Sequence, residues 1–293
     1  MATGYKPVVE EAFLKKLENL NLIVKRHFRG RLGGTHTSPR AGISLEFAEY
    51  KEYYPGDDFR TIDWNIYGRL EKLAIKSFKR EEDVPIYILL DTSKSMALGG
   101  KLDYAVKLAA TIAYLGLVDL NRVSVYAFGN ELISGVPPKA GARQIFHIFK
   151  YLSTLTPTSK TNLNAALEGF AKRRLETGLL ILLSDMLSEG GFTQGLSQLL
   201  FKRFELLIVQ ILAPEDLDPG FEGEVEITDI EDAQAPKLPA AEDAKQAYKT
   251  ALADYLNELD EFCLRRNIRR ALLSTSLPIE AAIFDKLRGV LFK

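Results

Sequence analysis

Three oxygen-bearing side chains follow a buried-type apolar run near residue 85. The run VPIYILL is followed at once by Asp91, and two serines stand at alternate positions, Ser93 and Ser95. Such a group could form a turn, provide a nucleophile or bind a metal ion. Which of these three interpretations applies depends on residues elsewhere in the chain.

Two further loops carry oxygen-bearing residues in comparable positions. The apolar run GLLILLS ends at Asp185, and the loop TPTSKTNLNAAL places Thr161 just before a predicted helix. A carboxylate at the end of a buried strand is costly unless it is paired, hydrogen-bonded or bound to a metal. Thr161 alone is more typical of a helix N-cap. Together the three loops offer five hard oxygen donors, which suit Mg²⁺ or Mn²⁺: Asp91, Ser93, Ser95, Thr161 and Asp185.

Only two of these five groups carry a negative charge and the other three are neutral hydroxyls, so the ligands would supply no excess of negative charge to a divalent ion. An open coordination position would then attract a carboxylate from outside, such as an Asp or Glu of a protein partner. Lys94 and Lys160 stand beside the candidate ligands and could weaken metal binding by placing positive charge near the ion.

The elements that position these loops follow from the pattern of apolar residues. Runs rich in apolar and β-forming residues predict four strands: 84–90, 122–128, 178–185 and 204–212. Helical spacing predicts four helices between them: 101–119, 143–155, 162–176 and 192–203. Towards the end of the chain we expect an edge strand in EVEITDIED, a long amphipathic helix over 240–267, a strand over 269–276 and a helix started by Pro278.

Strands that are apolar throughout and separated by helices indicate a sheet covered on both faces. Residues 84–293 are therefore predicted to form an α/β domain with a doubly wound, mostly parallel sheet. In such sheets ligands bind at the carboxyl ends of the strands, where the three candidate loops lie. Residues 1–83 are predicted to form a separate part, with a helix over 9–28 and a β-rich extension.

The overall composition gives little support for binding to nucleic acid or membrane. Lys and Arg number 38 against 39 Asp and Glu, and no apolar run approaches the roughly 20 residues of a membrane span. The single cysteine cannot form an internal disulfide, which favours a reducing, cytoplasmic location. Residues 24–31 are basic and residues 214–232 include nine acidic side chains. A solvated surface is the simpler interpretation of both, and an interaction arm is the alternative for the first.

Known catalytic patterns are poorly matched by this sequence. A phosphatase of the haloacid dehalogenase type needs a second aspartate two residues after the first, where this chain has Ser93. The sequence contains no G-x-S-x-G elbow, no phosphate-binding loop of the G-x-x-x-x-G-K-[ST] type and no dinucleotide fingerprint. A metal-dependent, phosphatase-like hydrolase that uses Asp91 is the alternative to an interaction module.

The pattern Asp91-x-Ser93-x-Ser95, with Thr161 and Asp185 in later loops, resembles the metal-ion-dependent adhesion site of von Willebrand factor A domains. The upstream stretch GDDFRTIDW resembles a signature of the bacterial domain-of-unknown-function 58 (DUF58) family, in which it precedes an A-type domain. Residues 20–290 share this similarity. The signature consists of Gly56, Asp57, Asp58, Arg60, Ile62, Asp63 and Trp64.

The resemblance implies a non-enzymatic protein-interaction module that depends on Mg²⁺ or Mn²⁺. It implies that Ser93, Ser95 and Thr161 touch the ion directly, while Asp91 and Asp185 act through waters or hold the hydroxyl groups. DUF58 proteins often occur beside MoxR-type AAA+ ATPases, which implies a chaperone-like role in complex assembly. A MoxR-type ATPase or its client is therefore the expected partner.

The GDDFRTIDW segment allows two interpretations of its own. Pro55 and Gly56 favour a turn, and Arg60 is the nearest cation that could separate the charges of Asp57 and Asp58. A salt-bridged turn that anchors the N-terminal part is one interpretation, and a partner-binding surface is the other.

Overall fold

The computed structural model describes residues 45–52, 66, 68, 73–80, 85–119, 121–158, 162–219, 225–227, 238–240 and 242–288. These residues fall into two compact units. In the smaller unit, β1 (Leu45–Glu52) and β2 (Ala74–Arg80) pair as antiparallel strands. The predicted helix over 9–28 and the basic segment 24–31 lie outside the described residues.

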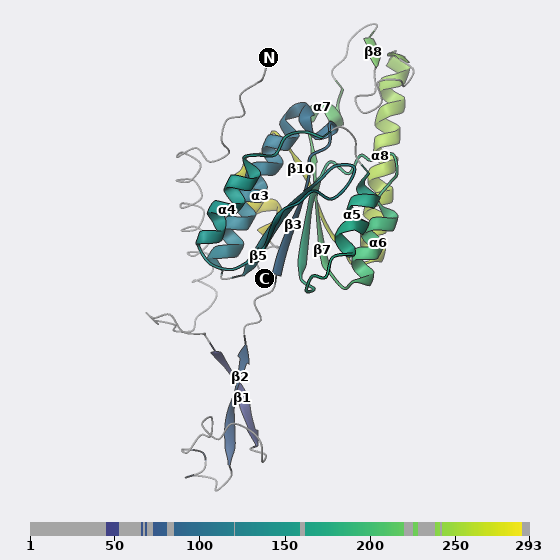
Figure 1. The fold of residues 1–293 in the computed structure, drawn as a ribbon. Coiled ribbons are helices and arrows are strands. Elements are labelled where there is room, and N and C mark those ends of the chain that lie inside the picture. The colour runs from purple at the N-terminus through teal and green to yellow at the C-terminus, as the bar shows by residue number, and fades with distance from the viewer. Residues whose placement is uncertain are drawn as a thin grey trace. The chain divides into compact units, whose positions relative to one another are not determined.

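A mixed sheet forms the centre of the larger unit (Figure 1). Its six described strands are, in spatial order, β10 (Arg269–Ser274), β7 (Glu205–Leu212), β6 (Leu179–Ser184), β3 (Pro85–Asp91), β4 (Arg122–Phe128) and β5 (Val136–Lys139). The first five are parallel to one another, and β5 is antiparallel to β4. The predicted α/β fold with a mostly parallel sheet is confirmed.

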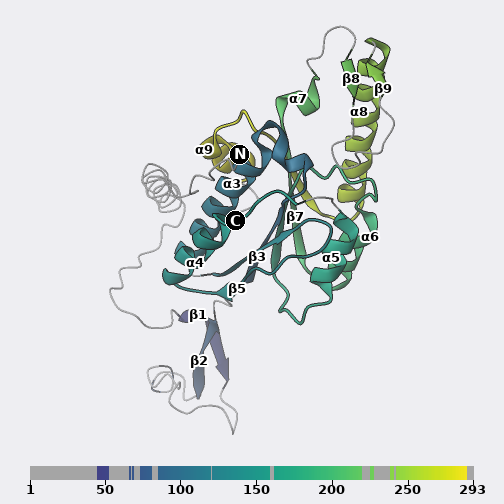
Figure 2. The same ribbon diagram turned by 45° about the horizontal axis from the view of Figure 1, so that its top comes forward.

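Helices cover both faces of this sheet (Figure 2). One face packs against α3 (Lys101–Val118), α4 (Arg143–Leu152), α9 (Ile279–Ala281) and the helical segment Ala282–Lys286. The other packs against α5 (Leu163–Ala171), α6 (Thr193–Phe201) and α8 (Glu242–Arg265). Within β3, Ile88 and Leu90 enter the first core while Tyr87 and Leu89 enter the second. This two-sided burial explains why the strand is apolar at every position before Asp91.

Three details differ from the expected elements. The helix predicted over 162–176 ends at Ala171. Strand β5 was not predicted because Pro137 and Pro138 lack backbone N–H groups, which restricts such a segment to the edge of a sheet. Strand β8 (Val225–Ile227), within EVEITDIED, pairs with β9 (Leu238–Ala240) in a separate sheet, and β10 forms the edge of the main sheet instead.

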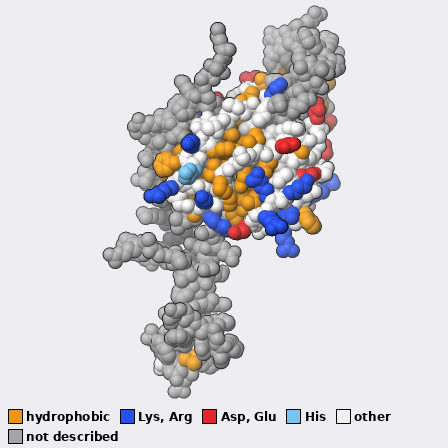
Figure 3. All heavy atoms as spheres, in the orientation of Figure 1, with side chains coloured by type: hydrophobic (Ala, Val, Ile, Leu, Met, Phe, Trp, Pro, Cys, Tyr) orange, Lys and Arg blue, Asp and Glu red, His pale blue; other side chains and the backbone are white. Residues whose placement is uncertain are grey.

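Basic side chains gather on the larger unit where α5 and α6 end (Figure 3). Both helices are followed by exposed residues of this kind: Lys172, Arg173, Arg174, Lys202 and Arg203. Positive charge at a helix C-terminus interacts favourably with the helix dipole. These residues follow the helices at the end where the parallel strands begin, away from the loops with the candidate ligands. Among the described helices, none combines the length and hydropathy needed to cross a lipid bilayer.

The loop that carries the serines packs closely against the segment after β7. It forms a short helix, Ser95–Gly100, in which Gly99 and Gly100 have φ angles of 57° and 70°. A Cβ atom added at Gly99 would lie 2.3 Å from the Cβ of Ala213, whereas one at Gly100 would meet nothing within 4 Å. The serine loop and α7 (Pro214–Leu217), which follows Ala213, are therefore held in a fixed contact.

We expect Gly99→Ala to destabilise the protein more than Gly100→Ala. Both variants place an alanine in left-handed backbone, at a cost of about 1–2 kcal/mol. Gly99→Ala adds overpacking against Ala213, for which about 1–3 kcal/mol more is typical. Urea denaturation of the two variants measures the difference, and equal losses of stability would contradict the close contact.

Candidate metal-binding site

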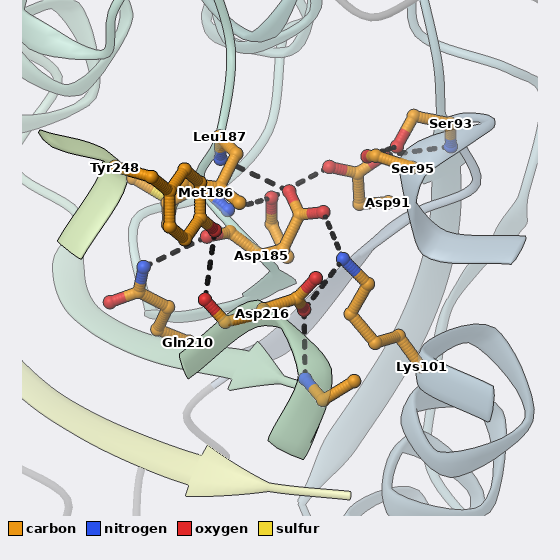
Figure 4. A network of polar contacts seen from close by, with 12 residues as sticks. Asp91, Ser93, Ser95, Lys101, Asp185, Met186, Leu187, Gln210, Asp216 and Tyr248 are labelled. Carbon is orange, nitrogen blue, oxygen red and sulfur yellow. Dashed lines mark hydrogen bonds and ion pairs between the residues drawn. The ribbon is translucent and has the colours of Figure 1, made fainter. Parts of the chain in front are cut away.

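The candidate site lies where β3 and β6 end side by side. These strands are parallel and in register, with Leu90 opposite Leu183, so Asp91 and Ser184 reach the same edge of the sheet. Asp185 follows β6 directly. The structure thus brings the aspartates of the two apolar strands to one edge, as their positions in the sequence predicted (Figure 4).

Asp91 organises the loop that follows β3. One of its carboxylate oxygens, Oδ1, accepts a hydrogen bond of 2.9 Å from the backbone N–H of Ser93. The other, Oδ2, accepts one of 2.6 Å from the hydroxyl of Ser184. The hydroxyl oxygens of Ser93 and Ser95 lie 2.9 Å apart. Asp91 and Ser93 are buried and Ser95 is half-buried, so the two hydroxyls form a compact pair at the end of the strand.

Asp185 is as deeply buried as Asp91, and both residues are only 1% exposed. Its Oδ1 accepts a hydrogen bond of 3.0 Å from the N–H of Leu187, and its backbone carbonyl accepts one of 2.8 Å from Gln210. Met186 has a left-handed φ of 62°, and its carbonyl accepts a hydrogen bond from the hydroxyl of Tyr255. Hydrogen bonds from β7 and α8 to the backbone of Asp185 and Met186 therefore fix the loop after β6.

Lys101, which is not among the predicted ligands, completes the network. Its ammonium nitrogen lies 2.9 Å from Oδ2 of Asp185 and 3.0 Å from Oδ2 of Asp216, and its side chain is only 2% exposed. Burial lowers the pKa of Lys101, but the two carboxylates outweigh this effect and raise it, so the ammonium is charged. A sequence signal did exist, because Lys101 stands four residues before Ala105 on the apolar face of its helix. A lysine on such a face implies a buried acidic partner.

Asp216 comes from α7 and is held by contacts of its own. Its Oδ2 also accepts a hydrogen bond of 2.8 Å from the N–H of Ala213, and its backbone carbonyl accepts one of 2.8 Å from the hydroxyl of Tyr248 in α8. Asp216 belongs to the acidic run 214–232. A solvated surface is therefore the wrong interpretation for this residue, because its carboxylate pairs with the buried ammonium of Lys101.

The electrostatics of Asp91 favour a bound cation. Burial raises the pKa of Asp91 to about 7, and the negative charge of Asp185 adds to the shift. Hydrogen bonds from Ser184 and Ser93 lower the pKa only in part. An ionised Asp91 is therefore unfavourable in the protein alone, and a nearby divalent cation would relieve the repulsion between the two carboxylates.

The donors present fit an ion that prefers oxygen. They are two carboxylates and two adjacent hydroxyls, the kind of ligand that Mg²⁺ and Mn²⁺ accept. In the part of the chain that the structure describes, three or more His, Cys, Asp or Glu residues nowhere come together as a metal cluster. A divalent ion at this site would therefore depend on hydroxyl groups and water rather than on a cage of carboxylates.

The third candidate loop is described only at its two ends. Thr161 and Lys160 lie outside the described residues. Before them, the N–H and hydroxyl of Thr158 donate to the carbonyl of Thr92 at 2.6 and 3.0 Å, which ties this loop to the serine loop. After them, the side chain of Asn162 accepts a hydrogen bond from the N–H of Ala165 at 2.9 Å. Asn162 is thus the N-cap of α5, and the simple interpretation of Thr161 as that cap is wrong.

Other predicted residues fall into two groups. Lys94 is exposed, so its charge faces solvent rather than the candidate ligands. The residues of the GDDFRTIDW segment lie outside the described residues, so both interpretations of it stay predictions: Gly56, Asp57, Asp58, Arg60, Asp63 and Trp64.

Comparison with known proteins finds similar sequences and structures. The profile of the family described as "Protein of unknown function DUF58" matches residues 49–257. Uncharacterised proteins of Mycobacterium tuberculosis and Mycobacterium bovis are each 25% identical over 222 residues, which cover 73% of this chain and 70% of theirs. The family match includes the candidate site.

Among solved structures, the conserved hypothetical protein BatB of Bacteroides thetaiotaomicron is 15% identical with a TM-score of 0.44, over 69% of this chain and 96% of that one. A von Willebrand factor type A protein of Catenulispora acidiphila is 18% identical with a TM-score of 0.37, over 47% of this chain and 34% of that one.

In metal-free buffer we expect the stability of the protein to fall as the pH rises from about 4 to about 7. The folded-state pKa of Asp91, about 7, lies above its ordinary value of 3.8. The unfolded chain therefore releases this proton at lower pH than the folded chain does, and the stabilisation present below pH 4 is lost through pH 7, by a few kcal/mol at most.

Asp91→Asn removes the titrating carboxyl group and should flatten the dependence of stability on pH. Urea denaturation at several pH values in the presence of EDTA measures both proteins. Parallel pH profiles for the wild type and the variant would show that Asp91 is not the group responsible.

Proposed function

Since this chain belongs to the DUF58 family, we propose that it acts as a non-enzymatic protein-interaction module that depends on a divalent metal ion. The observation that carries the proposal is the meeting of the Ser93 and Ser95 hydroxyls with two buried carboxylates, Asp91 and Asp185, at one edge of the sheet. Buried carboxylates in this arrangement favour a cation.

In this proposal the side chains have different roles. Ser93 and Ser95 bind Mg²⁺ or Mn²⁺ directly, together with Thr161 from the third loop. Asp91 holds the serine loop in shape through the N–H of Ser93, and Asp185 acts through water. When bound, a divalent ion offers an open coordination position to a carboxylate from outside. An Asp or Glu of a protein partner is therefore the expected ligand.

The contacts of Asp91 count against the alternative of a phosphatase-like hydrolase. Both of its oxygens accept hydrogen bonds, from Ser93 and Ser184. A carboxylate whose two oxygens are both engaged in this way is a poor nucleophile.

The proposed partner is a MoxR-type AAA+ ATPase or its client, in the assembly of a larger complex. This part of the proposal rests on the resemblance of the GDDFRTIDW segment and the candidate ligands to the DUF58 family. We also propose a cytoplasmic location, since Cys263 is a free, buried thiol and fits a reducing compartment.

We expect Ser95→Ala to weaken Mn²⁺ binding by about tenfold or more, because it removes a hydroxyl that touches the ion directly. Isothermal titration calorimetry measures the affinity. Lys94→Ala is the matched control, since Lys94 is exposed in the same loop and should leave Mn²⁺ binding within about threefold of the wild type.

Binding to a purified MoxR-type ATPase should require Mg²⁺ and should be lost in EDTA and in the Ser95→Ala variant. Equal binding in Mg²⁺ and in EDTA would falsify the metal-dependent mechanism. Turnover of p-nitrophenyl phosphate with Mn²⁺, abolished by Asp91→Asn, would instead establish the hydrolase alternative.

A further inference from the structure

We infer that Lys101 is a built-in cation of the candidate site, which weakens binding of the metal ion and strengthens binding of an outside carboxylate to the loaded site. The inference rests on the proposed function, because it concerns the same metal and the same kind of ligand. It adds two residues to the site, Lys101 and Asp216.

The position of Lys101 is fixed by contacts from two separate loops. Its ammonium lies between the carboxylates of Asp185 and Asp216, at 2.9 and 3.0 Å (Figure 4). Asp216 is itself held by the N–H of Ala213 and, at its carbonyl, by the hydroxyl of Tyr248. The positive charge therefore stays beside Asp185, one of the candidate metal-site residues.

Burial makes this charge effective. The side chain of Lys101 is 2% exposed, so its field is felt in a medium of low dielectric constant. The charge of Lys94 is closer in sequence to the serines but faces solvent, where water and salt screen it. Of these two lysines, Lys101 is the one that sets the electrostatic potential at the candidate ligands.

A count of charges gives the direction of the effect. With a divalent ion bound, Asp91 is ionised, and the carboxylates of Asp91, Asp185 and Asp216, with the ammonium of Lys101, leave two negative charges, which the ion balances. Without Lys101 the site would attract the metal more strongly, but the loaded site would keep one negative charge and repel a carboxylate. Without the charge of Asp216 both effects would have the opposite sign.

Three variants test this trade-off: Lys101→Met, Asp216→Asn and the double variant. We expect Lys101→Met to bind Mn²⁺ about tenfold tighter than the wild type and Asp216→Asn to bind it about tenfold weaker. The double variant restores the count of charges and should bind within about threefold of the wild type. Isothermal titration calorimetry with Mn²⁺ alone measures all four affinities.

A second measurement gives the affinity of the Mn²⁺-loaded site for an outside carboxylate, with acetate as the probe. Acetate that replaces water on bound Mn²⁺ lowers the relaxation rate of water protons. The acetate concentration for half of this effect should rise in Lys101→Met and fall in Asp216→Asn. Opposite changes in metal and acetate affinity separate this role from a structural one, because a loosened site would weaken both.

Folding is checked by thermal melting, since Lys101→Met leaves two carboxylates without their ammonium. If that variant does not fold, Asp216→Asn and the double variant still carry the test, because weaker Mn²⁺ binding in the first must be restored in the second. Failure to restore it would overturn the inference.

The outcomes distinguish the inference from the proposed function. If the wild type binds Mn²⁺ and the variants bind it equally well, the inference is wrong and the proposed function stands. If neither the wild type nor any variant binds Mn²⁺, both are wrong. If Lys101→Met alone binds Mn²⁺, the inferred effect of the ammonium is correct and the proposed function of the natural chain is wrong.

Discussion

The burial of carboxylates at the ends of neighbouring parallel strands is the constraint on which this edge of the protein depends. Asp91 and Asp185 lie in an interior that does not tolerate an isolated negative charge. Each is satisfied in a different way: Asp91 through the N–H of Ser93 and the hydroxyl of Ser184, and Asp185 through Lys101 and the N–H of Leu187. The loops after both strands take the shapes that these contacts require.

The same requirement connects distant parts of the chain. Lys101 begins α3 on one face of the sheet, whereas Tyr248 and Tyr255 belong to α8, which packs on the other face. They meet at the strand ends because Asp185, Met186 and Asp216 offer side-chain or backbone oxygens there. The polar network therefore joins the two helical layers at a place where the apolar cores do not, and it gives the edge a single defined arrangement.

Much of the larger unit could be predicted from the sequence, because a sheet covered on both faces leaves an unbroken apolar run for each central strand. Strands β3 and β6 show such runs, and β4 and β7 each contain one buried polar residue within the run, Ser124 and Gln210. Helix α3 could be predicted from the helical spacing of its apolar residues. Strand β5 and the one-turn helix α7 could not be predicted in these ways, since they are short and rich in proline or acidic residues. The aspartates and serines of the site were predicted from their places after strands. Lys101 was missed because a lysine on the apolar face of a helix indicates only that an acidic partner exists, and that partner, Asp185, lies 84 positions away. Thr161 stays a prediction.

The proline-containing strand β5 has a consequence for the behaviour of the protein in solution. It forms one margin of the main sheet, and two of its four residues, Pro137 and Pro138, have no N–H to donate to a further strand. A neighbouring molecule therefore finds few donors along this margin, so addition of a strand from another chain is disfavoured there. The proline pair thus makes this margin of the sheet a poor site for edge-to-edge association.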